Sequence, residues 1–338
     1  MTMQDTHVSL AHGNGGRYMR ELIHEIFARH LSNPYLRTDI DAAVLPWNAA
    51  DGELAFTTDS FTVQPIEFPG GNIGSLAVHG TTNDLAVAGA VPKYLSLGVL
   101  LEEGLEFAVL ERVVAGIAAA AKEAGVVVAA GDTKVVRRGE GGGIYLNTSG
   151  IGVKNPALKI GIEYSRPGDA VLVSGPVGDH GIAVMLAREQ FGLRGDLQSD
   201  AASVLPLTLE IAKLPGLRFM RDPTRGGIAT VAHEIVHGSG FGVVFAEERL
   251  PVRDSVRSVC EMLGYDPYFL ACEGRVVAVV AAEQAERVLA MWQALPSGRD
   301  ASIVGHVQEN PARLVLKTSI GGERVIEELE DDPLPRIC

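Results

Sequence analysis

Strand-like and helix-like runs alternate along the first half of the chain, and this alternation most restricts the folds open to it. Short runs rich in Val, Ile, Leu and Tyr predict strands, and longer stretches with apolar residues at helical spacing predict helices between them. The expected strands are 54–63, 94–101, 126–130 and 144–153, and the expected helices are 17–31, 73–88 and 107–124. Alternation of this kind is typical of an α/β domain.

A turn-rich connector follows this pattern. Asn155-Pro156 and Pro167-Gly168 favour turns, and 338 residues are enough for two domains of ordinary size, each with its own core. Beyond the connector we expect an α+β domain with strands at 170–174, 276–280 and 303–307, a hairpin at Gly321-Gly322, and helices at 182–189, 204–214 and 228–236. The predicted division is a glycine-rich segment with its helix (1–35), an N-terminal domain (36–153), the connector (154–168), a C-terminal domain (169–330) and a tail (331–338).

Charge and composition exclude several classes of protein. A net charge of −13 disfavours a surface for nucleic acid or an anionic membrane, and 46% hydrophobic residues with only 6% aromatics indicate the aliphatic cores of a soluble enzyme. Residues 1–16 lack the apolar core of a signal peptide. The three cysteines show no CxxC spacing, so we expect neither a disulfide framework nor a zinc site. These features together predict a cytoplasmic protein.

Residues 331–338 form a proline-stiffened tail that ends in a thiol. Pro333 and Pro335 each fix their own φ and push the preceding residue toward extended geometry, so the tail cannot finish as a helix or a central strand. An arm of this length reaches about 25 Å. Because thiolates are strong nucleophiles near neutral pH, Cys338 is a candidate carrier of an acyl group. On local evidence, a frayed end with an inert thiol explains these residues equally well.

Acidic residues stand beside Thr, Asn or Gly at four places where a predicted strand or helix ends. The sequences are TTDS, TND, GDTK and RDPTRGG, which contain Asp59, Asp84, Asp132 and Asp222. Carboxylate oxygens suit Mg²⁺, which commonly takes one or two of them beside phosphate oxygens and water. Helix caps and turns use the same residue types, so capping is the alternative for each motif.

A glycine-rich loop at 12–16, with the sequence HGNGG, precedes the first predicted helix. Glycines let backbone N–H groups approach an anion, and a helix N-terminus favours negative charge, so the loop is a candidate phosphate cradle. It is neither a Walker A motif nor a dinucleotide fingerprint, because no GKS or GKT ends it and no strand precedes it with the needed spacing. A plain flexible loop is the alternative.

Seven motifs, in order, resemble those of the HypE family of hydrogenase maturation proteins: HGNGG, TTDS, TTNDLA, GDTKVV, RDPTRGG, ACEGR and the final PRIC. The resemblance spans essentially the whole chain. It extends to the superfamily of aminoimidazole ribonucleotide synthetase and selenophosphate synthetase. It therefore implies a two-domain PurM-like fold, with an N-terminal ATP-binding α/β domain that forms a homodimer, a C-terminal α+β domain and a flexible tail.

The resemblance also implies a reaction. In the HypE family the terminal thiol, here Cys338, receives a carbamoyl group from a HypF-type carbamoyltransferase, and ATP drives its dehydration to a thiocyanate. The cyano group then passes to iron on a HypC–HypD-type complex, toward the nickel–iron hydrogenase centre. Phosphorylating the carbamoyl oxygen turns a poor leaving group into a good one, and phosphoryl transfer chiefly needs alignment and charge neutralisation.

Residue roles carry over from the family motif by motif. The resemblance gives Cys338 as the acceptor thiol, Lys134 as the cation for the transferring phosphate or the carbamoyl oxygen, and Glu273 as the base for an amide proton. The implied Mg²⁺ ligands are Asp59, Asp84 and Asp222, with Asp132 as an optional fourth. The implied nucleotide-binding residues are Gly13, Asn14, Gly15, Gly16, Asp59, Asn83, Asp84, Asp132 and Thr133. If the family resemblance is set aside, the sequence predicts that Lys134 is a solvated loop lysine and that Glu273 is a surface carboxylate.

Other functions stay open at this point. A selenophosphate-synthetase-like enzyme, or another small-molecule phosphoryl transferase of the superfamily, would share the fold and the carboxylates. The selenophosphate synthetases typically carry a Cys or selenocysteine in the N-terminal glycine-rich region, whereas no cysteine precedes Cys260 here. A non-catalytic carrier that binds nucleotide to gate the docking of a partner is the alternative from a different class.

Overall fold

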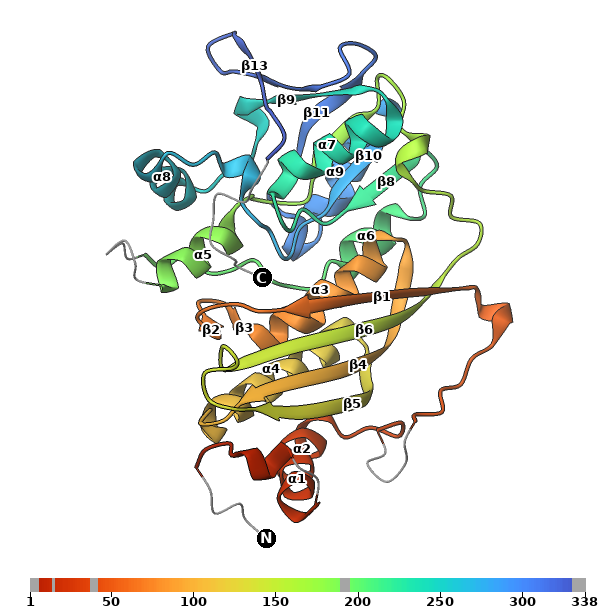
Figure 1. Cartoon of the computed structure of the whole chain (residues 1–338). Helices are drawn as coiled ribbons and strands as arrows, with labels where there is room; N and C mark the ends of the chain where they lie inside the picture. Colours follow the sequence, from red (N-terminus) through yellow and green to blue (C-terminus); the bar gives the residue numbers. More distant parts are fainter. Residues whose placement is uncertain (1–5, 14–15, 37–41, 189–194, 330–338) are drawn as a thin grey trace.

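The computed structural model describes residues 6–13, 16–36, 42–188 and 195–329 of the chain. Asn14, Gly15, Cys338 and the rest of the tail lie outside these ranges, so their predicted roles rest on the sequence alone. Within these ranges the chain forms two larger sheets, each with helices packed against it (Figure 1).

Four strands form the N-terminal sheet in the order β1-β6-β4-β5. They are β1 (Glu53–Phe61), β6 (Ile144–Lys154), β4 (Ala90–Glu102) and β5 (Val127–Val136), and only β4 and β5 pair in parallel. The helices α3 (Ile73–Val87) and α4 (Phe107–Ala124) lie against one face of this sheet, and the short hairpin of β2 (Glu67–Phe68) and β3 (Gly71–Asn72) leads into α3 (Figure 1). The four predicted strands and two predicted helices of this domain are confirmed, but β5 runs on to Val136, so the expectation that the strand ends before Asp132 is wrong.

Local sequence explains where these helices begin and end. Asn72 caps α3, because its side-chain oxygen accepts hydrogen bonds from the N–H groups of Gly74 and Ser75. The Ser75 hydroxyl accepts a hydrogen bond from the Asn72 N–H in return, which completes a capping box. Gly125 ends α4 in the left-handed conformation, which glycine adopts without a steric penalty.

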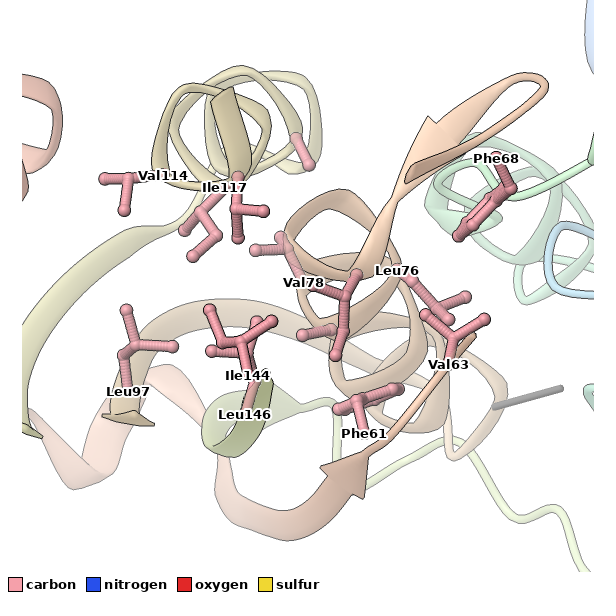
Figure 2. Close-up of a cluster of buried hydrophobic side chains, with 14 of the residues drawn as sticks. Phe61, Val63, Phe68, Leu76, Val78, Leu97, Val114, Ile117, Ile144 and Leu146 are labelled. Atoms are coloured by element: carbon pink, nitrogen blue, oxygen red, sulfur yellow. The ribbon is translucent and has the colours of Figure 1, made fainter. Parts of the chain in front are cut away.

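The core between helices and sheet is aliphatic, as the composition predicts. In Figure 2 the side chains of Val114 and Ile117 on α4 lie opposite Leu97 of β4 and Leu146 of β6, with Val78 of α3 beside them. Each of these five side chains is at most 3% exposed. Burying one such side chain contributes roughly 1.5–3 kcal/mol, so the alternation along each strand decides which face of the sheet meets the helices.

The first predicted helix is present as one continuous run in three parts. These are α1 (Gly16–Leu22), the π-helical η2 (Ile23–Ala28) and α2 (Arg29–Leu31). Leu22, Ile26 and Leu31 on this run are buried in the same core as α4. The predicted apolar stripe is therefore confirmed, although the middle of the helix is wound more loosely than an α-helix.

The C-terminal sheet has seven strands in the order β13-β12-β9-β11-β7-β10-β8. Its strands are β7 (Ala170–Val173), β8 (Leu217–Arg221), β9 (Gly242–Ala246), β10 (Val277–Val280), β11 (Ser302–Gln308), β12 (Leu314–Lys317) and β13 (Glu323–Val325). The predicted strands at 170–174, 276–280 and 303–307 are confirmed, as is the hairpin at Gly321-Gly322 between β12 and β13. The strands β8 and β9 were missed, although they are no shorter than β7 and β10, which were predicted.

Five helices accompany this sheet: α5 (Asp179–Ala187), α6 (Leu205–Ile211), α7 (Gly227–Ser239), α8 (Asp254–Leu263) and α9 (Ala285–Gln293). The helix α7 packs on one face of the sheet, and α6 and α9 pack on the other. The predicted helices at 182–189, 204–214 and 228–236 are confirmed as α5, α6 and α7, whereas α8 and α9 were missed. No helix in the described ranges is long and apolar enough to cross a membrane.

The predicted cores are separate only in part. One cluster of buried side chains belongs to the C-terminal domain alone, as expected. Another cluster joins Phe68 and Leu76 of the N-terminal half to Ile182 of α5 and Val256 of α8. The expectation of a separate core is therefore wrong for the N-terminal domain, because this domain covers the apolar sides of α5 and α8. This shared core holds residues from both halves of the chain in a fixed relation at the seam between them.

Candidate active site

Four predicted acidic residues from distant parts of the chain line one small pocket at this seam. Asp59 comes from β1 and Asp84 from α3, whereas Asp222 follows β8 and Glu273 precedes β10. We call this the acidic pocket; its other described lining residues are Ser60, Phe61, Gly80, Thr224 and Arg225. Its volume of about 30 Å³ fits an ion or a water molecule and is too small for a nucleotide.

Close packing of β1 on α3 sets the first two carboxylates side by side. Thr57 and Asp59 lie two residues apart on β1 and therefore share one face of the strand. The Thr57 hydroxyl donates a hydrogen bond of 3.0 Å to Asp84 Oδ2. A Cβ on Gly80 would lie 2.7 Å from the Phe61 ring and 3.9 Å from Asp59 Oδ2, so only glycine lets the strand approach the helix this closely.

Burial raises the pKa of every carboxyl group in the acidic pocket. It raises the pKa of Asp222 to about 7, with repulsion from Asp84 as the second cause. Burial, followed by repulsion from Asp222, holds the pKa of Glu273 well above its usual range. The pKa values of Asp59 and Asp84 are also raised by burial, against opposing hydrogen bonds from neighbouring groups. Mutually repelling, partly desolvated carboxyl groups are characteristic of a functional site and favour a bound cation.

The carboxylate oxygens of the acidic pocket are the kind of ligand that a hard cation prefers, but they do not form a complete set of metal ligands. The buried Glu273 Oε1 has no hydrogen-bond partner among the described residues. Across the described ranges, no three His, Cys, Asp or Glu side chains lie close enough together to hold a metal ion by themselves. Mg²⁺ normally keeps several waters and binds through one or two carboxylates plus substrate phosphates. The pocket therefore fits an ion that arrives with a nucleotide.

Sequence reasoning missed Arg225, which contributes the one positive charge among the described lining residues of the acidic pocket. Arg225 lies in the RDPTRGG motif just before α7, and its charge opposes the rise in the pKa of Asp59. The sequence could have indicated Arg225 through its position, because it stands in the same turn as Asp222. A guanidinium at this position can meet an anionic ligand such as a phosphate.

Asn83, expected to bind nucleotide, is instead bonded to the protein backbone. It is buried on α3, and its amide nitrogen donates hydrogen bonds of 3.0 Å to the carbonyl oxygens of Ala202 and Glu273. Its side-chain oxygen accepts a hydrogen bond of 2.9 Å from the Val204 N–H. Asn83 thus ties the N-terminal domain to two loops of the C-terminal half.

A second cavity, of about 190 Å³, lies beside β5 and under the N-terminal helix. Gly131, Asp132 and Thr133 of β5 form part of its wall, and the rest is mostly apolar. Gly13 also lies against β5, since a Cβ at that position would be 2.7 Å from Val135 Cβ. An apolar cavity with a few polar groups at its edge is typical of a small-molecule site. Of the predicted nucleotide residues, Asp132 and Thr133 therefore lie at this cavity, whereas Asp59 and Asp84 line the acidic pocket.

The single chain does not bring Lys134 to the acidic pocket. One row of paired residues crosses the N-terminal sheet from Asp59 through Thr148 and Leu97 to Gly131. Because this row spans three strand spacings, its two ends lie about 14 Å apart. Lys134 is on the far strand, where its Nζ lies 3.7 Å from Asp132 Oδ2 and both side chains are well exposed.

Comparison with known proteins agrees with this architecture. Residues 39–154 match the N-terminal domain of AIR synthase related proteins, and residues 166–317 match the C-terminal domain of that family. The carbamoyl dehydratase HypE of Azotobacter vinelandii is 45% identical over 340 residues, which cover 100% of this chain and 99% of that protein. The carbamoyl dehydratase HypE of Escherichia coli K12 is 43% identical, with 98% of this chain and 99% of that protein covered.

Solved structures show the same arrangement. A crystal structure of HypE in complex with ATP matches with a TM-score of 0.92 at 43% identity, covering 97% of this chain and 99% of that chain. A HypE–HypF complex matches with a TM-score of 0.80 at 44% identity, covering 91% and 99%. The thiamine monophosphate kinase of Aquifex aeolicus has a TM-score of 0.61 at 20% identity over 81% of this chain and 89% of its own, and so shares the fold alone.

Proposed function

Because the chain belongs to the HypE family of AIR synthase related proteins, with the two-domain PurM-like fold that its motifs predicted, we propose that it dehydrates a carbamoyl group on Cys338 to a thiocyanate with ATP. The enzyme is an ATP-dependent carbamoyl dehydratase. Its product supplies the cyanide ligand of a nickel–iron hydrogenase. The observation that carries this proposal is the convergence of Asp59, Asp84, Asp222 and Glu273 at one pocket.

The last described residue before the tail lies near the acidic pocket. Leu329 is the last described residue, and its Cδ1 lies 3.7 Å from the place that a Cβ on Gly226 would occupy. Gly226 directly follows Arg225, which lines the pocket. Between Leu329 and Cys338 the chain can span at most about 30 Å when fully extended. This reach supports delivery of the Cys338 thiol to the acidic pocket of its own chain.

The reaction balances without free water. The γ-phosphoryl group of ATP passes to the carbamoyl oxygen, which breaks the bond to ADP, and the amide nitrogen gives up one proton. The C–O bond of the resulting S–C(=NH)–OPO₃ group then breaks, the second N–H proton leaves, and a C≡N bond forms. The products are protein thiocyanate, ADP, inorganic phosphate and one net proton, so the carbamoyl oxygen leaves within the phosphate.

Each residue of the acidic pocket has one task in this scheme. Asp59, Asp84 and Asp222 hold the Mg²⁺, which neutralises charge on the ATP phosphates when bound. Glu273 accepts a proton from the carbamoyl nitrogen, and its raised pKa makes the ionised carboxylate a stronger base. The adenosine end of ATP occupies the cavity beside β5, bordered by Asp132 and Thr133.

A homodimer explains how Lys134 takes part. Leu54, Phe56 and Leu100 are 57%, 65% and 41% exposed on the face of the N-terminal sheet that the helices leave open. Lys134 pairs with Leu100 across β4 and β5, so it belongs to the same face. A second copy docked there covers this apolar surface and can bring its own Lys134 to the opposing acidic pocket.

Two partners are implied by the reaction. A HypF-type carbamoyltransferase loads Cys338, in keeping with the HypE–HypF complex among the similar structures. A HypC–HypD-type complex accepts the cyano group on iron.

Cys260 and Cys272 are free thiols in the structure, which agrees with a reducing cytoplasm where Cys338 also stays reduced.

A labelled carbamoyl oxygen tests the proposal. Protein carrying a carbamoyl group on Cys338, with the heavy oxygen isotope in its carbonyl, is given MgATP for one turnover. The expected result is thiocyanate on Cys338 and the label in inorganic phosphate. Label that stays on the protein or enters water overturns the phosphorylation route. ATP hydrolysis without thiocyanate, equal in wild type and Cys338→Ala, points instead to a nucleotide-gated carrier.

A further inference from the structure

Side chains from two other parts of the chain hold the peptide units on both sides of Glu273. The Glu273 N–H donates a hydrogen bond of 3.1 Å to Asp200 Oδ1. The Glu273 carbonyl oxygen accepts a hydrogen bond of 3.0 Å from the amide nitrogen of Asn83. Asp200 precedes α6 in the C-terminal half, whereas Asn83 belongs to α3. The main chain of the proposed base is therefore held from both halves of the chain.

Asn83 has little capacity left for any other partner. Both of its amide N–H groups and its oxygen are used on backbone groups, and the residue is 1% exposed. Its neighbour Asp84 lines the acidic pocket. One turn of α3 thus places a carboxylate at the proposed phosphate site and an amide against the backbone of the proposed base.

Gly274 shows how closely the Asp200 segment packs on the loop that carries Glu273. A Cβ on Gly274 would lie 1.9 Å from the carbonyl oxygen of Asp200 and 3.0 Å from its carbonyl carbon. These atoms are backbone and cannot move aside as a flexible side chain could. Glycine after Glu273 is therefore required by close approach of the two segments.

A buried charge network orients Asp200 in turn. Arg275 Nε lies 3.3 Å from Asp200 Oδ2, and Arg275 Nη2 lies 3.5 Å from Asp179 Oδ2. Arg253 Nε donates a hydrogen bond of 2.9 Å to the same oxygen of Asp179. Asp179 begins α5 and Arg253 directly precedes α8, the two helices of the shared core. The contact between Asp200 and Glu273 is thus connected through Arg275 and Asp179 to two helices that pack in the shared core.

We infer that Asn83 and Asp200 are positioning residues for dehydration, which hold the Glu273 main chain so that its carboxyl group meets the nitrogen of the carbamoylated thiol. This inference rests on the proposed function. Neither side chain touches the substrate; both act through Glu273. Loss of either one frees the loop and slows proton transfer, while the groups that bind nucleotide stay in place.

Two measurements on full-length Asn83→Ala, carbamoylated at Cys338, test this inference. The expected single-turnover rate of thiocyanate formation falls roughly 10- to 100-fold, while the Kd for MgATP stays within about threefold of wild type. Leu316→Ala on β12 is the control, since Leu316 is buried and three strands separate β12 from β10, which follows the loop. It loses stability without touching the loop, and it should keep the wild-type rate below its melting temperature.

A pair of substitutions at Asp200 separates positioning from general loss of structure. In Asp200→Asn the side-chain oxygen can still accept the Glu273 N–H, whereas Asp200→Ala removes the acceptor. We expect Asp200→Ala to slow dehydration and Asp200→Asn to recover most of the rate. If Asn83→Ala does not fold, this pair decides the question. Equal rates in Asp200→Ala and wild type overturn the role of Asp200.

Combination with a changed base shows whether Asn83 acts through Glu273. In a Glu273→Asp background, adding Asn83→Ala should cost less than about twofold, because the base is already misplaced. Full additivity, or a wild-type rate in Asn83→Ala itself, overturns the inference.

If wild type forms no thiocyanate, the proposed function fails instead. The hold of Asn83 on the Glu273 main chain is then judged by hydrogen exchange at the Glu273 and Val204 amides, which Asn83→Ala should accelerate more than Leu316→Ala does; equal exchange overturns it.

Discussion

The Thr57 hydroxyl donates a hydrogen bond of 3.0 Å to Asp84 Oδ2, and this contact joins β1 to α3 at the acidic pocket. Asp59 follows two residues after Thr57 on the same face of β1, so one hydrogen bond sets the spacing of two of the proposed Mg²⁺ ligands. It also lowers the pKa of Asp84 against the larger effect of burial. Thr57 was not among the residues that sequence reasoning assigned to the site.

Removing this hydrogen bond should weaken binding of MgATP. In Thr57→Val the Asp84 carboxylate loses its donor, so its pKa rises further and the ionised form that a cation needs becomes less populated. A hydrogen bond of this kind contributes about 0.5–1.5 kcal/mol, which corresponds to a loss of roughly two- to tenfold in affinity by calorimetry. Thr58→Val, on the opposite face of β1, is the control. Equal affinities in the two variants would remove Thr57 from the site.

Asp222→Asn should stabilise the nucleotide-free protein while abolishing turnover. With the pKa of Asp222 raised to about 7, the folded state keeps a proton that the unfolded state releases, so the free energy of unfolding falls as pH rises from about 4 to about 7. The shift corresponds to at most about 4 kcal/mol at higher pH. Melts in chelator should show the variant above wild type at pH 8 and near it only at about pH 4. A variant less stable than wild type at both values contradicts this explanation.

Mixed dimers should reveal whether the site is shared between copies. Lys134→Ala and Glu273→Ala should each accept the carbamoyl group and then stall before thiocyanate. If Lys134 acts on the acidic pocket of the other copy, random mixing leaves one intact site in each mixed dimer, so about one quarter of wild-type activity returns. If Lys134 acts within its own chain, no activity returns on mixing. Normal thiocyanate formation by either single variant would show that the substituted residue is not needed for dehydration.

The open face of the N-terminal sheet should carry the dimer. Placing a charge at the centre of an apolar interface is costly, so Phe56→Asp should shift sedimentation from dimer to monomer at micromolar concentration. Met262→Asp on α8 is the matched control, since Met262 is 61% exposed and lies on a different surface. A Phe56→Asp dimer as stable as that of the control places the interface elsewhere.

Local patterns were sufficient to predict the elements of the N-terminal sheet. Strands such as β6 and helices such as α4 are long enough for their periodicity to appear in the sequence. Among the short strands of the other sheet the prediction was uneven, since β7 and β10 were found and β8 and β9 were missed. The shared core that joins Ile182 to Leu76 was missed because it depends on contacts between segments about a hundred residues apart.

The acidic residues of the site were predicted from motifs, but their grouping was not. Asp59, Asp84, Asp222 and Glu273 meet at one pocket, while Asp132 and Lys134 lie at the far edge of the same sheet. The order of the strands in the sheet decides this separation, and local sequence patterns do not predict that order. Asn83 shows the same limit, since the motif gives the residue type and only the fold shows that its amide meets the backbone of Glu273.

Intact-mass spectrometry tests the central claim most directly. The full-length protein is incubated with a HypF-type carbamoyltransferase, carbamoyl phosphate and MgATP, with Cys338→Ala as the control. We expect the wild-type mass to rise by one carbamoyl group at Cys338 and then to fall by one water as the thiocyanate forms, with the control unchanged. A carbamoyl adduct that never loses water, or the same adduct on Cys338→Ala, contradicts the assignment of Cys338 as the site of dehydration.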